Sequence, residues 1–522
     1  MSNNNKKEEI SDQAFGMLMF GLILLGVCKN INRIEYWFYE HRFLLFTLGV
    51  SVVYAAVMFL RWRFKMKHPE VYERELAIKA MQYRRAQPTN EKPGATSKSG
   101  EVYIGYTMKD RKSLVLTNED RAGQVQIVGA TGRGKTRYVI LPWYLQDIDN
   151  GNVPILIDGK GDTDIAERIK QKYESDPLRQ PLYYFDLSNP DESWVINPLE
   201  GDSASEVADR LIASLEFESA YYRDVQHAAA LMFFEIMNWC GEPYSLEKLY
   251  RCLTVNAEVA VMISEPQKWI PEELMDELKR FQALSSRDKE ERYSGLISQL
   301  RPFATGEMAK LVNGNRNEPK YLSLESLMFI QKDEVKRAAV ILLNTMKHQK
   351  SAKILGKMII QTLAWATSSR TGTEAFVPIF LDEFSAFVYD GFEQFQNKAR
   401  SFNVALHLSH QSLGDLEKIS NSFAKTVNVN TNVKVLLGLN DPETADYYAK
   451  HIGTKTAAKR TERGKAGAFG SLEMTGDMSI RNVEEYKIHP NRLRNYSQGV
   501  GVLSLLVAGI PVTEQVQFRG AS

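Results

Sequence analysis

The first seventy residues contain two long stretches without a charged side chain. Residues Ala14–Cys28 are uncharged, and Phe43–Leu60 form a second uncharged stretch of eighteen residues. Both approach the roughly 17 to 25 residues that an α-helix needs to cross a bilayer. We therefore predict a transmembrane anchor with spans at about residues 13–31 and 43–61. The alternatives are a cleaved signal peptide for the first stretch, or buried core helices for both.

Basic residues flank the two stretches on the same side. They precede the first stretch and follow the second, at Lys6, Lys7, Arg61, Arg63, Lys65 and Lys67. Because basic residues are enriched in cytoplasmic segments, we expect both termini and the bulk of the chain in the cytoplasm. Residues 29–42, between the spans, also carry three basic residues, which weakens this inference.

Residues 71–100 are predicted to form a linker, because turn-forming residues crowd its second half. Beyond it, buried strands and helices alternate. Apolar runs at residues 124–128, 153–157, 377–381 and 404–410 predict the strands. Alternation of this kind predicts an α/β fold with a parallel sheet, whose ligand lies at the carboxyl ends of the strands.

Residues 201–325 have a helical pattern throughout. Ser203 and Glu206 form a capping box before an amphipathic helix, and further helices are predicted at about 220–240, 245–263 and 270–300. The pattern therefore predicts a run of several helices in this part of the chain.

Two features stand out late in the chain. Asp441, Pro442 and Glu443 predict a capped helix that ends at Gly453. The following residues, Arg460–Gly476, contain four glycines among lysines and arginines, which is typical of a flexible loop. That loop is either a surface hairpin or a segment that contacts DNA.

Composition narrows these possibilities. The 522 residues, 44% of them hydrophobic, suffice for a large core and more than one globular unit. A net charge of +1 excludes a uniformly basic surface that coats nucleic acid, although a local basic patch is still possible. The three cysteines lack metal-site spacing, which fits a reduced, cytosolic environment.

A phosphate-binding loop follows the first predicted strand. It matches the pattern G-x-x-x-x-G-K-[ST] with Gly129, Ala130, Thr131, Gly132, Arg133, Gly134, Lys135 and Thr136. In such loops the backbone N–H groups and the next helix N-terminus bind the phosphates. Lys135 would contact the β and γ phosphates of ATP, and Thr136 would bind Mg²⁺. The alternative is a glycine-rich turn without a ligand.

The apolar run at 377–381 ends in Asp382 and Glu383, so a buried strand would carry two carboxylates to the edge of the sheet. This is a Walker B arrangement, in which Asp382 would hold Mg²⁺ and Glu383 would polarise the attacking water. Paired acids also occur in solvated turns, but the complete P-loop favours the catalytic interpretation.

Polar residues around the next predicted strand are weaker candidates. Gln411 at its end could sense the γ-phosphate, and Arg400 before it could be an arginine finger that reaches the ATP of a neighbouring subunit. An ordinary strand-end amide and an exposed arginine are the alternatives. His407 and His410 are interpreted as structural.

Several segments in this order resemble the type IV secretion coupling proteins, the TraD/TraG/TrwB-like group. They are the two spans, G-A-T-G-R-G-K-T, I-D-G-K-G-D, I-N-P-L, L-D-E-F, S-H-Q-S and D-P-E-T-A-D-Y-Y. The similarity extends over nearly the whole chain. The family's usual K-G-E after the second strand is K-G-D here, and the alignment of Arg400 rests on its spacing from Glu383.

The resemblance implies a hexameric ATPase of the RecA-like, FtsK/HerA branch in the bacterial inner membrane. It would use ATP and Mg²⁺, with Gln411 and Arg400 in hydrolysis. The resemblance also implies an all-α domain at 201–325, which would select the substrate. That domain would be inserted into a nucleotide-binding motor domain formed by residues 101–200 and 326–522, with the anchor at 1–70. Its partners would be a relaxase or relaxosome with single-stranded DNA, and the inner-membrane channel proteins of the secretion system.

Two functions follow as hypotheses. The first is a coupling ATPase that drives relaxase-bound DNA, or protein, into a secretion channel during conjugation. The second is a receptor or scaffold in which nucleotide binding gates substrate docking without processive pumping. An ABC-type exporter lacks support, because no L-S-G-G-Q signature is present.

Overall fold

The structure is a computed structural model that describes residues 51–60, 62–63, 100–175, 182–264, 269–331, 337–466, 472–507 and 510–520. The chain divides into two units, Met1–Ala77 and Ile78–Ser522. In the first unit, residues 51–60 and 62–63 are helical and exposed. The rest of the two predicted spans, and nearly all of the predicted linker, lie outside the described residues. Within the described ranges, no helix is both long and apolar enough to cross a membrane.

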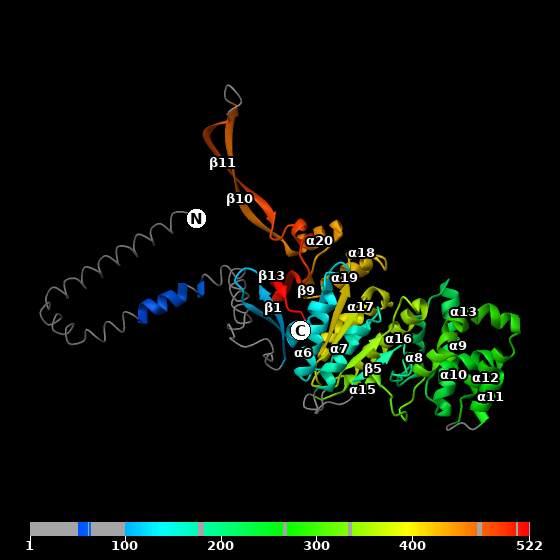
Figure 1. Cartoon of the computed structure of the whole chain (residues 1–522). Coiled ribbons are helices and arrows are strands. Elements are labelled where there is room, and N and C mark those ends of the chain that lie inside the picture. Colours follow the sequence, from blue (N-terminus) through cyan, green and yellow to red (C-terminus); the bar gives the residue numbers. More distant parts are fainter. Residues whose placement is uncertain are drawn as a thin grey trace, which may run out of the picture. The chain divides into compact units, whose positions relative to one another are not determined.

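The second unit is built on an eleven-stranded sheet (Figure 1). Its strands lie in the order β2-β1-β13-β12-β9-β3-β8-β7-β4-β6-β5. Their bounds are β1 Glu101–Thr107, β2 Ser113–Thr117, β3 Val125–Val128, β4 Ile155–Asp158, β5 Tyr183–Asp186, β6 Ala339–Leu342, β7 Val377–Asp382, β8 Val404–His410, β9 Val433–Leu436, β12 Val500–Val507 and β13 Ile510–Phe518.

The strands from β9 to β5 in this order are parallel. Strands β3, β4, β6, β7 and β8 are buried at every position, as expected where helices cover both faces of a parallel sheet. The predicted parallel α/β sheet is therefore confirmed. Because the strands are parallel, the carboxyl ends of β3, β8, β7 and β4 meet along one edge.

The remaining four strands extend the sheet in antiparallel fashion. β12 pairs with β9, β13 with β12, β1 with β13, and β2 with β1. Gly105 in β1 has φ +153°, and a Cβ there would collide with the carbonyl of Gln517 in β13. This approach requires glycine. The extension joins the first and last strands of the unit.

Helices and short helical turns connect these strands. They are α5 Asn118–Ala122, the π-helix η1 Thr136–Ile140, α6 Leu141–Asp149, α7 Thr163–Glu174, α16 Gln349–Ser368, the 3₁₀ turn η2 Phe384–Ala386, α17 Phe392–Ala399, the 3₁₀ turn η3 Arg400–Phe402, α18 Leu413–Glu417, α19 Asn421–Asn430, α20 Pro442–Ile452 and α21 Pro490–Arg494. The predicted α20 is present. The Asp441 side chain accepts bonds from the backbone N–H groups of Glu443 and Thr444, and Gly453 ends the helix.

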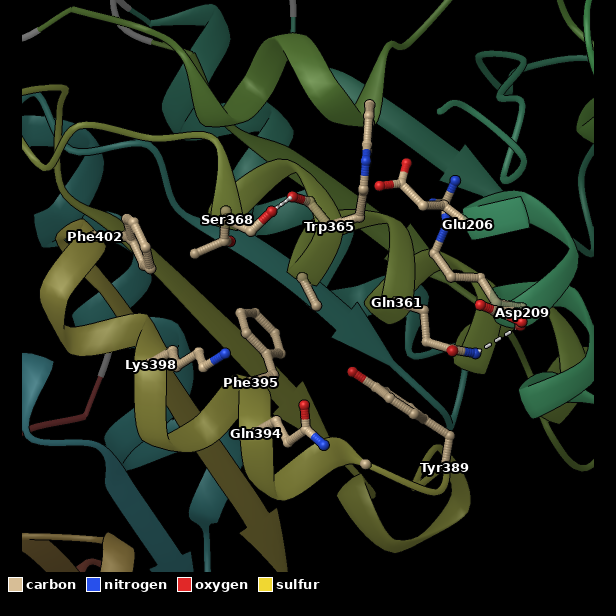
Figure 2. A pocket seen from close by; sticks show the side chains of 14 residues that line it. Glu206, Asp209, Gln361, Trp365, Ser368, Tyr389, Gln394, Phe395, Lys398 and Phe402 are labelled. Carbon is tan, nitrogen blue, oxygen red and sulfur yellow. Dashed lines mark hydrogen bonds between the residues drawn. The ribbon is translucent and has the colours of Figure 1, made fainter. Parts of the chain in front are cut away.

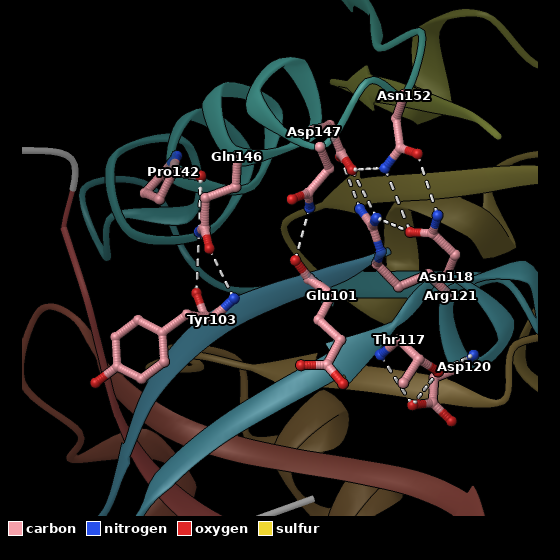
Figure 3. A network of polar contacts seen from close by, with 11 residues as sticks. Glu101, Tyr103, Thr117, Asn118, Asp120, Arg121, Pro142, Gln146, Asp147 and Asn152 are labelled. Atoms are coloured by element: carbon pink, nitrogen blue, oxygen red, sulfur yellow. Dashed lines mark hydrogen bonds and ion pairs between the residues drawn. The ribbon is translucent and has the colours of Figure 1, made fainter. Parts of the chain in front are cut away.

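A buried ion pair joins α5 to α6 (Figure 3). Arg121 donates to both carboxylate oxygens of Asp147, at 2.7 and 2.6 Å, and both side chains are fully buried. Asn118 accepts from Arg121 at 2.7 Å, and Asn152 donates to Asp147 at 2.6 Å. A buried pair with these additional bonds offsets its desolvation cost.

All described regular elements between β5 and β6 are helices. They are α8 Ala204–Ser214, α9 Ala220–Cys240, α10 Leu246–Thr254, α11 Asn256–Ser264, α12 Glu272–Gln282, α13 Ser286–Ala304, α14 Glu307–Val312 and α15 Leu324–Met328. Ser203 caps α8 as predicted, and Gly241 ends α9 in the left-handed conformation. These helices lie in the predicted all-α segment, but the domain boundaries remain predictions.

The segment after α20 differs from the predicted flexible loop. Residues Thr454–Ala466 form β10 and Leu472–Tyr486 form β11, and the two pair as a two-stranded antiparallel sheet of their own. Pairing of the two strands satisfies backbone hydrogen bonds that a loop would leave to water. The described residues therefore form the paired strands of a hairpin, and contact of this segment with DNA stays a prediction.

Candidate nucleotide site

The P-loop lies between the end of β3 and the start of η1. Gly132 and Gly134 have positive φ angles of 76° and 87°. A Cβ on Gly134 would collide with the ring of Tyr138, so the sequence requires glycine there. Arg133, inside the loop, donates to the Tyr496 carbonyl and to Asn440, at 3.2 and 3.1 Å. The loop is thereby held against the segment after β9 and the segment after α21.

Lys135 and Thr136 begin the helix after the loop. Lys135 is 5% exposed, and its ammonium donates to the Gly129 carbonyl at 2.7 Å. Burial lowers the pKa of Lys135. The Thr136 hydroxyl donates to Oδ2 of Asp382 at 2.9 Å. The two predicted Mg²⁺ ligands, Thr136 and Asp382, are therefore adjacent although they are far apart in the sequence.

Asp382 and Glu383 lie at the end of β7, as predicted. The second oxygen of Asp382 accepts a bond from the Ser409 hydroxyl at 2.8 Å, so both carboxylate oxygens are oriented. Glu383 has a left-handed backbone with φ 59°. Such a conformation is costly for a residue with a side chain and is concentrated at functional sites. It turns Glu383 away from the direction of the strand.

Gln411 connects the P-loop to Glu383. Its side-chain oxygen accepts a bond from the Thr131 hydroxyl at 2.9 Å, and its amide donates to Glu383 at 3.5 Å. The backbone N–H groups of Gln411 and Ser412 both donate to Asp415 at 3.0 Å. Gln411 is therefore placed by its own loop between the two other parts of the site.

Arg400 does not join this group within one chain. It is exposed and lies in η3, just before the amino end of β8. Gln411 follows the carboxyl end of the same strand, so the two residues lie at opposite edges of the sheet. The assignment of Arg400 as an arginine finger stays a prediction that requires a second subunit.

Lys160 and Asp158, at the tip of β4, are site residues that the sequence analysis missed. The Lys160 ammonium lies 3.1 Å from Glu383 and 3.5 Å from Asp382. Asp158 is fully buried; burial and then the Asp382 charge raise its pKa to about 6. A lysine between glycines directly after a buried strand is the signal that could have pointed to Lys160.

The two histidines of β8 differ in their surroundings. His407 stacks on Phe380 at 4.2 Å and is packed, which agrees with the structural interpretation. His410 bonds through Nδ1 to the Ser412 carbonyl at 2.8 Å and through Nε2 to Gln126 at 2.9 Å. Burial lowers the pKa of His410 to about 4, so its ring is neutral near pH 7. Because a carbonyl only accepts, Nδ1 carries the proton.

The K-G-D sequence also has a local explanation. Asp162 is the N-cap of α7, and its side chain accepts a bond from the backbone N–H of Asp164 at 3.1 Å. Aspartate is among the preferred N-cap residues. The departure from the family's K-G-E is therefore compatible with the start of α7.

A separate cavity of about 330 Å³ lies between α8, α16 and α17 (Figure 2). Trp365, Tyr389, Phe395 and Phe402 line it together with polar residues such as Arg210. None of the P-loop, Asp382, Glu383 or Gln411 contributes to its wall. The cavity is therefore distinct from the nucleotide site.

Known proteins support the fold and the resemblance. Residues 377–497 match the family described as "TraM recognition site of TraD and TraG". The type 4 coupling protein DotL of Legionella pneumophila is 23% identical over 489 residues, which cover 83% of this chain and 61% of DotL. The chain thus spans about three fifths of that relative's length.

Two solved structures of the plasmid coupling protein TrwB have the same fold. The complex with a non-hydrolysable ATP analogue has a TM-score of 0.55 at 12% identity, covering 81% of this chain and 90% of TrwB. The complex with ADP and Mg²⁺ has a TM-score of 0.54 at 13% identity, covering 78% and 89%. Together with the family match and DotL, they confirm the resemblance of this chain to the type IV secretion coupling proteins.

Proposed function

We propose that this protein is a coupling ATPase of a type IV secretion system, which recruits a substrate and drives it into the secretion channel. The observation that carries the proposal is the convergence of Lys135, Thr136, Asp382, Glu383 and Gln411 at one sheet edge. The similarity to DotL and TrwB, both named as coupling proteins, supports it.

ATP and Mg²⁺ are the proposed substrate and cofactor. The oxygens of the Thr136 hydroxyl and the Asp382 carboxylate lie 2.9 Å apart, and oxygen ligands of this kind suit Mg²⁺. When bound, the ion would neutralise phosphate charge. Lys135 would exchange its bond with the Gly129 carbonyl for the phosphates, and the backbone N–H groups of Gly129–Thr136 would surround them.

Glu383 is the proposed base. In hydrolysis a water oxygen bonds to the γ-phosphorus while the bond to the β,γ-bridging oxygen breaks, and the water proton passes to the Glu383 carboxylate. The products are ADP and phosphate. Gln411, which contacts Glu383 and Thr131, would orient that water. Arg400 would act on the ATP of a neighbouring subunit in a homohexamer.

The proposed partners come from the relatives. The name of the matched family, a TraM recognition site, favours a relaxosome component together with relaxase-bound single-stranded DNA. The other proposed partners are the channel proteins of the secretion system and the inner membrane. Residues 13–31 and 43–61 would form the membrane anchor, and the motor domain would lie in the cytoplasm. The exposed helical residues 51–60 are compatible with a span there.

Two substitutions test the proposal in the full chain. Lys135→Ala should abolish ATP binding, and Glu383→Gln should retain ATP but lower turnover by about a thousandfold. Both should abolish substrate transfer. Glu417→Gln, an exposed carboxylate on α18, is the control.

The outcome also separates the two hypotheses. Wild-type turnover that DNA stimulates, with transfer lost in Glu383→Gln, supports a pump. Transfer that persists in Glu383→Gln but is lost in Lys135→Ala would instead establish nucleotide-gated docking without pumping.

A further inference from the structure

The ammonium of Lys160 lies among the carboxylates of the nucleotide site. It is 3.1 Å from Oε1 of Glu383 and 3.5 Å from Oδ2 of Asp382, the same oxygen that accepts the Thr136 hydroxyl. Burial opposes its charge, but Asp382 and Glu383 more than compensate and raise the pKa of Lys160. Lys160 is therefore a second cation beside Lys135.

The backbone that carries Lys160 is held on both sides. The buried Asp158 carboxylate accepts bonds from the backbone N–H groups of Lys160 and Asp162, at 3.1 and 2.7 Å. The Gly159 carbonyl accepts from the backbone and the hydroxyl of Thr345, at 2.7 and 2.8 Å. The two bonds to Asp158 fix the loop 159–161 on the end of β4, and the two bonds from Thr345 join it to the segment after β6.

The same loop packs closely against the catalytic carboxylate. A Cβ on Gly159 would lie 3.1 Å from the Cβ of Glu383, and Gly161 has φ +70° with Asn344 against it. Gly161 is thus required by its backbone conformation, and Gly159 allows the close approach to Glu383 without displacing a neighbour. The loop fixes the backbone of Lys160. The Lys160 side chain, in contrast, is 43% exposed and has four flexible methylenes.

A Mg²⁺ ion held by Thr136 and Asp382 would compete with the Lys160 ammonium for Asp382. It would place two positive charges where the ammonium now interacts, and like charges repel. With ATP bound, the nearest added anion would be the γ-phosphate, because the proposed base Glu383 would face the water that attacks it. We propose that Lys160 transfers from Asp382 to the γ-phosphate and makes the site distinguish ATP from ADP.

This assignment rests on the proposed ATPase function and adds a residue to it. Lys160 would keep its contact with Glu383 and donate to a γ-phosphate oxygen, so that it stabilises the charge of the transferring group. ADP lacks that oxygen. Removing the Lys160 ammonium would therefore cost a charge-assisted hydrogen bond when ATP is bound, but not when ADP is bound. The ratio of the affinities for ATP and ADP thus measures the contact between Lys160 and the γ-phosphate.

Binding without hydrolysis provides the main test. In the full-length protein, affinities for a non-hydrolysable ATP analogue and for ADP, both with Mg²⁺, are compared in wild type and Lys160→Met. We expect the analogue to bind about tenfold more weakly in the variant and ADP to bind unchanged. Lys160→Arg should restore part of the preference. The matched control is Lys172→Met, because Lys172 is 38% exposed and pairs with Asp149 at 3.1 Å.

A second readout uses the metal alone. Mn²⁺ binding to the nucleotide-free protein should be tighter in Lys160→Met, because the competing ammonium is gone. Unchanged Mn²⁺ binding, or an equal loss of affinity for both nucleotides, would overturn the assignment of Lys160. If the wild-type protein binds neither nucleotide, the proposed function itself is overturned. If the wild type hydrolyses ATP and Lys160→Met has the same preference for the ATP analogue over ADP as the wild type, only the role of Lys160 is refuted.

Discussion

The sheet edge that carries the nucleotide site, called the nucleotide edge below, and the Arg121–Asp147 pair both contain oppositely charged side chains in contact. They differ in how far these side chains are buried and in whether their partners can be exchanged. Arg121 and Asp147 are fully buried, and Asn118 and Asn152 add further bonds to them. At the nucleotide edge, Lys160 is 43% exposed and Glu383 is 24% exposed, and each has room to exchange partners. A buried charge with fixed partners contributes to the fold. A charge with replaceable partners can take part in a reaction.

The largest expected effect comes from the nucleotide edge. Asp382→Asn removes the carboxylate that accepts the Thr136 and Ser409 hydroxyls. We expect ATP turnover to fall by at least about a hundredfold. The thermal midpoint should hold or rise, because Asp382 repels the buried Asp158. Parallel ATPase assays and thermal unfolding check this, and a clear loss of stability would contradict the comparison.

The opposite outcome is expected for the buried pair. Asp147→Ala leaves the Arg121 guanidinium buried without its partner, which should lower the free energy of unfolding by about 3 to 5 kcal/mol. Denaturant titration measures it. The double variant Arg121→Met with Asp147→Leu should recover most of this loss. If the single variant lost turnover while keeping its stability, the distinction between the two regions would fail.

His410 tests a residue between these extremes, because it is buried yet bonds to the loop of Gln411. His410→Leu removes the donor to the Ser412 carbonyl and the acceptor for Gln126. We expect a loss of about 1 to 3 kcal/mol in stability. Since the loop of Gln411 is released, kcat should also fall, with little change in KM for ATP. His410→Asn, which can restore the donor, is the comparison variant; equal kcat in all three proteins would make His410 purely structural.

The smallest effect concerns pH. Burial and Asp382 raise the pKa of Asp158 from 3.8 to about 6, so between these values the unfolded chain releases a proton that the folded protein retains. Stability therefore falls as pH rises from 4 to 6, and Asp158→Asn should flatten this decline by roughly 2 kcal/mol. Unfolding curves across this range measure the slope. A wild-type slope equal to that of the variant would show that Asp158 ionises normally.

The sequence predicted the parts of the site that local patterns encode. The P-loop, the acids after β7 and Gln411 each follow a buried run, and parallel strands bring their ends to one edge. Lys160 and Ser409 were missed because their roles depend on strand order. Lys160 follows β4, which lies beside β7, and Ser409 in β8 donates to Asp382 at the end of β7. The linear sequence does not indicate which strands are neighbours. Arg400 stays undecided for a related reason, since its partner would belong to another subunit.

The same limit applies to the fold. Periodicity located β3, β4, β7 and β8 of the parallel half and most helices of the segment 201–325, but it did not locate β5, β6 or β9. It did not predict that residues 460–466 and 472–476 lie in two long paired strands, because glycines among basic residues resemble a loop until cross-strand pairing is considered. β10 and β11 acquire their order from each other rather than from local propensity.

The hydrophobic core has a practical consequence for anyone who wishes to divide this protein. One continuous cluster of buried side chains includes Ile155 of β4 and Phe185 of β5 together with Leu211, Phe233 and Leu300 of the helical segment. Cutting the chain on either side of that segment would expose apolar surface on both fragments. The helical segment and the sheet should accordingly melt in a single calorimetric transition, and limited proteolysis should not release the helices as an intact folded fragment.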